Sequence, residues 1–211
     1  MIYRDKKSFL ILFILSISAY SNVIAQLKNS RSPFKVVGYY FLNAALSDTA
    51  STDSNYLFLN KITHLNIAFI NPDSSGNFRQ HLAIETLIKK AHDKNVKVLA
   101  SIAGGGPHPY FSSLLQDNER ATFIENLVAM AKRYQLDGID VDLEGSDIDG
   151  NYQKFIVELS AALKADKKLI TSAIATAYKD QLPDKALKQF DFVNVMSYDR
   201  TGPWRPQDPG D

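Results

Sequence analysis

The stretch that decides the fold is DGIDVDLE, residues 137–144. Because side chains alternate across a β-strand, Asp140, Asp142 and Glu144 share one face and the apolar residues between them share the other. In a sheet covered by helices the apolar face meets the helices. The acidic face must then look into a barrel or a cleft, and we expect Glu144 at the carboxyl end of the strand, where α/β active sites lie.

The row of three acids predicts a functional site and not a structural one. Like charges this close do not all ionise freely, so we expect a shared proton and at least one raised pKa. Asp137 is out of phase with the row and precedes Gly138, so we interpret it first as a turn or strand-start residue.

A calcium loop is the alternative for these acids. Such a loop needs a bidentate glutamate at its twelfth position, where this chain has Asn151. The alternating apolar residues also do not fit an exposed loop, so we predict no metal and no other cofactor.

Outward from this strand, short apolar segments alternate with amphipathic helical ones. The pattern predicts parallel strands with helices outside them. The expected strands are 35–41, 64–70, 96–103, 138–144, 169–175 and 192–199, and the expected helices are 82–92, 124–131, 152–163 and 183–189. An open doubly wound sheet and a (β/α)8 barrel cut short both fit, although the first turn lacks a glycine-rich phosphate loop.

Composition excludes several classes of protein. The chain has 211 residues, of which 45% are hydrophobic, so it is not disordered. The 24 basic residues nearly balance the 23 acidic ones, which gives no indication of nucleic-acid binding. The absence of cysteine excludes disulfides, thiolate metal sites and a cysteine nucleophile.

The first residues differ from the rest. Basic residues precede an apolar run at 9–15, and small residues follow before Gln26. The run is well short of the roughly 20 residues that a membrane span needs. We therefore predict a signal peptide at 1–25, a leader at 26–34 and a catalytic domain at 35–211, with a secreted or periplasmic mature protein that is not held in a membrane.

Residues 137–144 match the D-x-x-D-x-D-x-E motif of glycoside hydrolase family 18, the chitinases and their relatives. Other segments resemble the family in order: GYYF (38–41), Ala68-Phe69, SIAGG (101–105) and MSYD (196–199). The resemblance covers 35 to about 205 and implies a TIM (β/α)8 barrel of which only about six β/α units are present. The family's last two strands and its late tryptophan are missing.

The resemblance implies a substrate-assisted retaining mechanism. In it, Glu144 is the general acid and then the base, and Asp142 holds the acetamido N–H of the sugar. Asp140 shares a proton with Asp142, and Tyr198 donates its O–H to the acetamido oxygen.

Further residues are expected to bind the sugar. By parity, Tyr39 and Phe41 share a face of the expected strand 35–41, and Ile67 and Phe69 share a face of the expected strand 64–70. For Phe41 and Phe69, packing in the core is an equal alternative. The remaining predicted binding residues are Ser101, which is also expected to support the acids, Gly105, Met196, Asp199 and Trp204.

We therefore expect a glycosidase that hydrolyses β-1,4-linked N-acetylglucosamine in chitin or its oligomers. The alternatives are an endo-β-N-acetylglucosaminidase acting on N-glycan cores and a non-catalytic chitin-binding lectin. Two departures from the family are Ala103, where a glycine is usual, and Leu143, where an aromatic is common. We expect this chain to be a fragment with exposed sheet edges and an apolar interior, poorly stable and weakly active or inactive, and the full-length protein to be a monomer.

Overall fold

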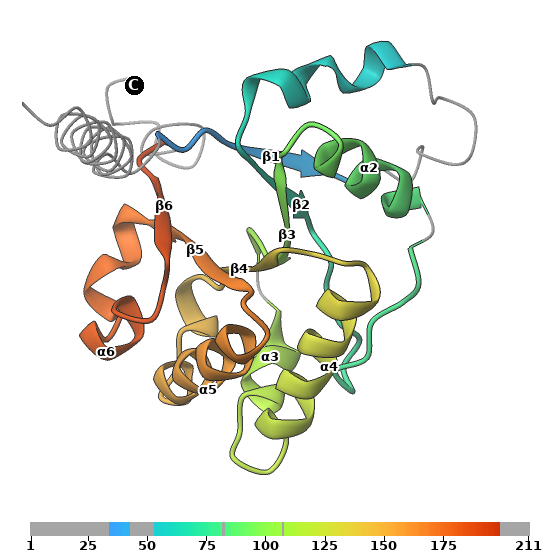
Figure 1. Cartoon of the computed structure of the whole chain (residues 1–211). Coiled ribbons are helices and arrows are strands. Elements are labelled where there is room, and N and C mark those ends of the chain that lie inside the picture. Colours follow the sequence, from blue (N-terminus) through green and yellow to red (C-terminus); the bar gives the residue numbers. More distant parts are fainter. Residues whose placement is uncertain (1–33, 43–52, 82, 107, 199–211) are drawn as a thin grey trace, which may run out of the picture. The chain divides into compact units, whose positions relative to one another are not determined.

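The computed structural model describes residues 34–42, 53–81, 83–106 and 108–198. Its main unit begins at Val36 and contains a six-stranded parallel sheet whose strands lie side by side in chain order (Figure 1). The strands are β1 (Val37–Phe41), β2 (His64–Ala68), β3 (Lys97–Ala103), β4 (Gly138–Asp142), β5 (Leu169–Ala175) and β6 (Phe192–Met196). The six predicted strands are all confirmed, and so is the partial barrel. The predicted signal peptide and all but the last residue of the leader lie outside the described residues.

Helices connect the strands. The longer ones are α2 (Ala83–His92), α4 (Arg120–Arg133) and α5 (Tyr152–Ala165), and each contains a predicted apolar stripe. The expected helix at 183–189 is the shorter α6 (Asp184–Leu187), with Pro183 at its cap. The shorter segments that were not predicted are η1 (Asp53–Lys61), α3 (Pro109–Leu114), η2 (Gly145–Asp147) and η3 (Thr176–Gln181).

No helix in the described ranges combines the length and the apolar character needed to span a bilayer.

The hydrophobic core lies between the helices and the outer face of the sheet. Ile139 and Val141 of β4 and the following Leu143 are buried in it. The rings of Phe123 on α4 and Phe155 on α5 stack with their centroids 5.7 Å apart, which joins the two helices over this face. The predicted apolar side of 138–144 therefore does meet the helices, and Leu143 belongs to that core.

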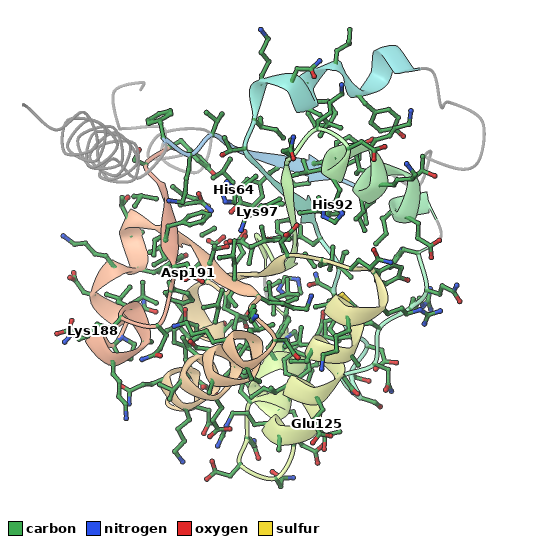
Figure 2. The ribbon with its side chains drawn as sticks, viewed as in Figure 1. His64, His92, Lys97, Glu125, Lys188 and Asp191 are labelled. Atoms are coloured by element: carbon green, nitrogen blue, oxygen red, sulfur yellow. The ribbon has the colours of Figure 1, made fainter. Side chains whose placement is uncertain are left out.

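Side chains just before alternate strands tie the sheet together at its amino-terminal end. The Asp137 carboxylate accepts the N–H of Val98 at 2.8 Å. The Asp191 carboxylate, labelled in Figure 2, accepts the N–H of Ile170 at 2.9 Å. In the same way, the Thr63 hydroxyl, just before β2, accepts the N–H of Val36, just before β1, at 2.9 Å. These contacts satisfy backbone donors at the start of each strand pair. Asp137 is therefore a strand-start residue, as predicted.

The sheet curls until side chains of its first and last strands meet. Asn194 of β6 donates to the Tyr39 hydroxyl of β1 at 3.1 Å. Lower in the interior, the rings of His64 and Phe192 meet edge to face at 5.1 Å. The expectation of an apolar interior is wrong, because the concave face carries hydrogen-bonding side chains, among them Ser101, Asp140, Asp142, Thr171 and Asn194.

Candidate active site

The three acids of the deciding stretch form a row that rises from the interior to the end of β4. Asp140 is fully buried, Asp142 is 4% exposed, and Glu144 is half-buried. The strand itself ends at Asp142, but the backbone at Glu144 is still extended, with φ −131° and ψ 154°. The alternation therefore continues through Glu144, and the acids stay on one side of the chain.

Asp140 is held by hydroxyl groups from three other strands. Tyr39 of β1 and Ser101 of β3 donate to Asp140 Oδ2 at 2.9 and 2.8 Å. Thr171 of β5 donates to Oδ1 at 2.5 Å. The strand register explains two of these contacts, since Ser101 and Thr171 are the direct neighbours of Asp140. Burial raises the pKa of Asp140, and the three donated hydrogen bonds oppose that rise only in part.

Asp142 lies between the other two acids of the row, and its pKa is the one that they raise. Burial, followed by the charges of Asp140 and Glu144, raises its pKa to about 8. Its Oδ1 is buried and has no hydrogen-bond partner among the described residues. Asp142 therefore holds a proton at neutral pH, and one of its oxygens is open to a polar group of a ligand.

Glu144 stands at the end of the row. Burial raises its pKa, and the nearby charge of Asp147 raises it further. A carboxyl group kept protonated toward neutral pH is suited to donate a proton to a leaving oxygen. Among the described residues, no group of three His, Cys, Asp or Glu side chains is arranged to hold a metal ion.

The predicted aromatic binding residues divide into two kinds. Tyr39 uses its hydroxyl on Asp140, so it supports the acids from below; burial raises the pKa of this phenol. Phe41 is 59% exposed, and its ring meets Phe69 edge to face at 5.8 Å. Phe41 and Phe69 therefore offer apolar surface at the end of β1 and β2, as a sugar platform requires.

Phe69 does not continue the alternation of β2. The parity prediction placed it with Ile67, but Ile67 is buried in the helix-facing core. The strand ends at Ala68, and Phe69 turns instead against Gly104, which has φ +92°. A Cβ on Gly104 would lie 2.4 Å from the Phe69 ring, so only glycine allows this contact.

Two residues of β3, Ser101 and Ala103, have structural roles beside the acids. Ser101 is fully buried and donates to Asp140, which is the support of the acids expected of it. Ala103 has φ +70°, a conformation that glycine adopts more easily. The Asn71 side chain holds this backbone in place by accepting the Ala103 N–H at 2.6 Å and donating to its carbonyl at 2.9 Å.

The other predicted binding residues lie around the carboxyl ends of the strands. Gly105 is exposed after β3, and Met196 is the half-buried last residue of β6. Tyr198 lies two residues further on and is 62% exposed. Asp199 and Trp204 are outside the described residues, so the structure does not place them.

Several residues that support the site were missed in the sequence. Thr171 and Asn194 reach Asp140 and Tyr39, and Asn66 is fully buried beside Tyr39 in the register of β1 and β2. Strand parity alone would have pointed Thr171 and Asn194 inward. Their partners, however, depend on the register between strands, which one sequence does not contain.

With this geometry in place, comparison with known proteins decides the family. The sequence model of the Glycosyl hydrolases family 18 matches residues 35–210. The chain belongs to this family. Its partial barrel is therefore that of glycoside hydrolase family 18, and the matched range contains the acid row.

Among the relatives of this family 18 chain are several chitinases. A solved chitinase from the chitin utilization locus of Flavobacterium johnsoniae is 35% identical, with a TM-score of 0.72, and the match covers 82% of this chain and 57% of that one. A class V chitinase of Lotus japonicus is 26% identical over 92% of this chain and 55% of its own. A chitinase-like effector of Moniliophthora roreri is 28% identical over 68% of this chain and 41% of its own. The chain spans about half the length of the curated relatives it matches.

Proposed function

We propose that this family 18 chain hydrolyses β-1,4-linked N-acetylglucosamine, as chitin or chito-oligosaccharides, with retention at the anomeric carbon. The observation that carries the proposal is the end of the acid row, where Asp142 is buried with one carboxyl oxygen unpartnered among the described residues and Glu144 follows it on the same side of the chain, both with a raised pKa. The chitinases among its relatives support the choice of polymer.

In the proposed reaction, Glu144 gives its proton to the glycosidic oxygen as that bond to the anomeric carbon breaks. The carbonyl oxygen of the sugar's own acetamido group forms the new bond to this carbon, so no protein nucleophile is needed. Asp142 accepts a hydrogen bond from the acetamido N–H through an oxygen that has no partner among the described residues, and passes its own proton toward Asp140. Glu144, now ionised, takes a proton from water, whose oxygen opens the intermediate ring.

The supporting contacts fit these roles. Hydroxyl donors from three strands hold Asp140 in place and stabilise its ionised form, so that it can accept a hydrogen bond from the protonated Asp142. Tyr198, which is exposed beyond β6, is proposed to donate to the acetamido oxygen and to fix the angle of attack. Because a signal peptide is predicted, we also propose that the chain acts outside the cytoplasm. The full-length protein is proposed to be a monomer.

The function is tested by offering the chain chito-oligosaccharides of four to six sugars, from chitotetraose to chitohexaose. Proton NMR then identifies the anomer of the first products. We expect slow cleavage that yields the β-anomer first, because attack by the acetamido group and then by water inverts the carbon twice. Release of the α-anomer first would contradict the mechanism, and the absence of both cleavage and binding would contradict the function.

Two further substrates separate the alternatives. Cleavage of a high-mannose glycopeptide but not of chito-oligosaccharides would assign the site to N-glycan cores. Binding of the oligomers without cleavage, unchanged when Glu144 is replaced, would make the chain a lectin. The present proposal predicts a preference for chito-oligosaccharides.

A further inference from the structure

A buried aspartate paired with a histidine lies close to Glu144 in the chain and has no part in the proposed reaction. The 3-10 segment η2 begins directly after Glu144, and the N–H of Asp147 donates to the Glu144 carbonyl at 3.0 Å. From this tight turn the charge of Asp147 acts on Glu144. Asp147 is only 3% exposed, which is rare for an aspartate unless a partner or a function holds it there.

The partner comes from a different connection of the barrel. His108 lies in the segment between β3 and α3, and its Nδ1 is 3.5 Å from Asp147 Oδ2. The imidazole is 17% exposed and is held edge-on by the rings of Tyr110 and Phe111, at centroid distances of 6.0 and 5.8 Å. The pair therefore joins the connection after β3 to the connection after β4, directly beside the end of the acid row.

Stability is a poor explanation for this arrangement. The cost of removing two charges from water often exceeds the attraction between them, so a buried pair contributes little net stability. A pair whose negative member lies one tight turn from Glu144 has a more specific effect, because its charge acts on Glu144 through a partly buried environment.

We propose that Asp147, paired with His108, is a positioning residue that keeps Glu144 protonated until a glycosidic oxygen takes the proton. The ionised Asp147 repels the negative charge that Glu144 gains on donation. A protonated His108 offsets that repulsion, so the two partners act on Glu144 in opposite directions. This inference rests on the proposed role of Glu144 as the acid.

Among the described residues, the other titratable groups near the pair and Glu144 are two phenols and one acid. Tyr110 of α3 faces Asp147, and burial, followed by the charge of Asp147, raises the pKa of this phenol. Tyr178 of η3 lies against Gly145 at the start of the turn. Asp142 is the other acid that faces Glu144.

The test is a titration of the full chain labelled with carbon-13 at the glutamate side-chain carboxyl. The glutamates to be resolved are Glu85, Glu119, Glu125, Glu144 and Glu158. In Asp147→Asn the titration midpoint of Glu144 is expected to move to lower pH, because a like charge is lost. In His108→Gln it is expected to move to higher pH, because the positive charge that the imidazole brings to Asp147 when it is protonated is lost. The other glutamates should not move.

Asp149→Asn is the matched control, since Asp149 lies in the same loop but caps the N–H of Asn151. It should leave the Glu144 midpoint unchanged. A purely structural pair would lower the melting temperature in both variants and move no midpoint, which would overturn the proposal. So would a shift in the same direction in both variants.

Activity gives a second, separate reading. In an active chain, the alkaline limb of the pH profile of kcat/KM should move to lower pH in Asp147→Asn. The carboxyl titration needs no substrate, so the two proposals fail separately. Shifted midpoints in a chain that cleaves nothing would remove the proposed function alone, and fixed midpoints in an active chain would remove the positioning role alone.

Discussion

Glu144→Gln is expected to lower kcat for chito-oligosaccharides by about 10²–10⁴-fold, the usual contribution of a general acid-base residue. Glutamine keeps the shape of the side chain but has no proton to give to the leaving oxygen and cannot activate water. Because Glu144 is half-buried at the end of the row and not in the core, the melting temperature should change little. Initial rates and thermal melting of both proteins measure this.

Glu125→Gln is the matched control for that change. Glu125 lies on the exposed side of α4, a different element from the strand that carries the acids (Figure 2). The same loss of one carboxylate there should leave kcat and KM unaltered. Equal activity of Glu144→Gln and the parent chain would show that Glu144 is not the acid.

Gly138→Ala is expected to destabilise the fold by roughly 3 kcal/mol, at or above the upper end of the usual cost of overpacking. A Cβ at this position would lie 2.2 Å from the carbonyl oxygen of Leu169 on the neighbouring strand. Since that oxygen belongs to the backbone, β4 and β5 must separate where their pairing begins. Asp140 lies two residues further along β4, so the acid row is displaced as well. Urea unfolding gives the free energy of the change.

Gly150→Ala provides the comparison. A Cβ on Gly150 meets nothing within 4 Å, so the substitution should change the free energy of unfolding by no more than about 0.5 kcal/mol. If Gly138→Ala proved as stable as Gly150→Ala, the close approach of β4 to β5 would be wrong.

The sequence was sufficient for the fold because its signals are local and periodic. The apolar alternation at 138–144 located β4 and its helix-facing side, and the stripes of α4 and α5 located the main cover of that side. The position of the acids followed from parity, since a strand gives its side chains only two directions.

Which side chains on different strands contact each other could not be predicted from periodicity and parity. Support of the acids by Ser101 was predicted, but Tyr39 was expected to meet the sugar, and register and curl bring its hydroxyl to Asp140 instead. Asp147 and His108 are 39 residues apart in numbering and lie on different connections, so no local pattern joins them. The misplacement of Phe69 has a different origin, because the end of β2 at Ala68 leaves no parity to follow.

The pH dependence of stability follows from the buried acids. In the unfolded chain Asp142 ionises near its ordinary pKa of about 4, and in the folded chain it keeps its proton to about pH 8. Between these values the folded state binds more protons than the unfolded state, so the contribution of Asp142 to stability falls as the pH rises. Above about pH 8 the loss levels off, because both states are then ionised.

The protonation of Asp142 tests the central claim most directly, because its pKa is raised by burial and then by the charges of Asp140 and Glu144 on the same face. Carbon-13 labelling of the aspartate side-chain carboxyls, with Asp142→Asn to assign the signal, gives its titration curve without any substrate. The account predicts a midpoint near 8 for Asp142. A midpoint near 4, that of an ordinary solvated aspartate, would show that the acids do not share an enclosed face.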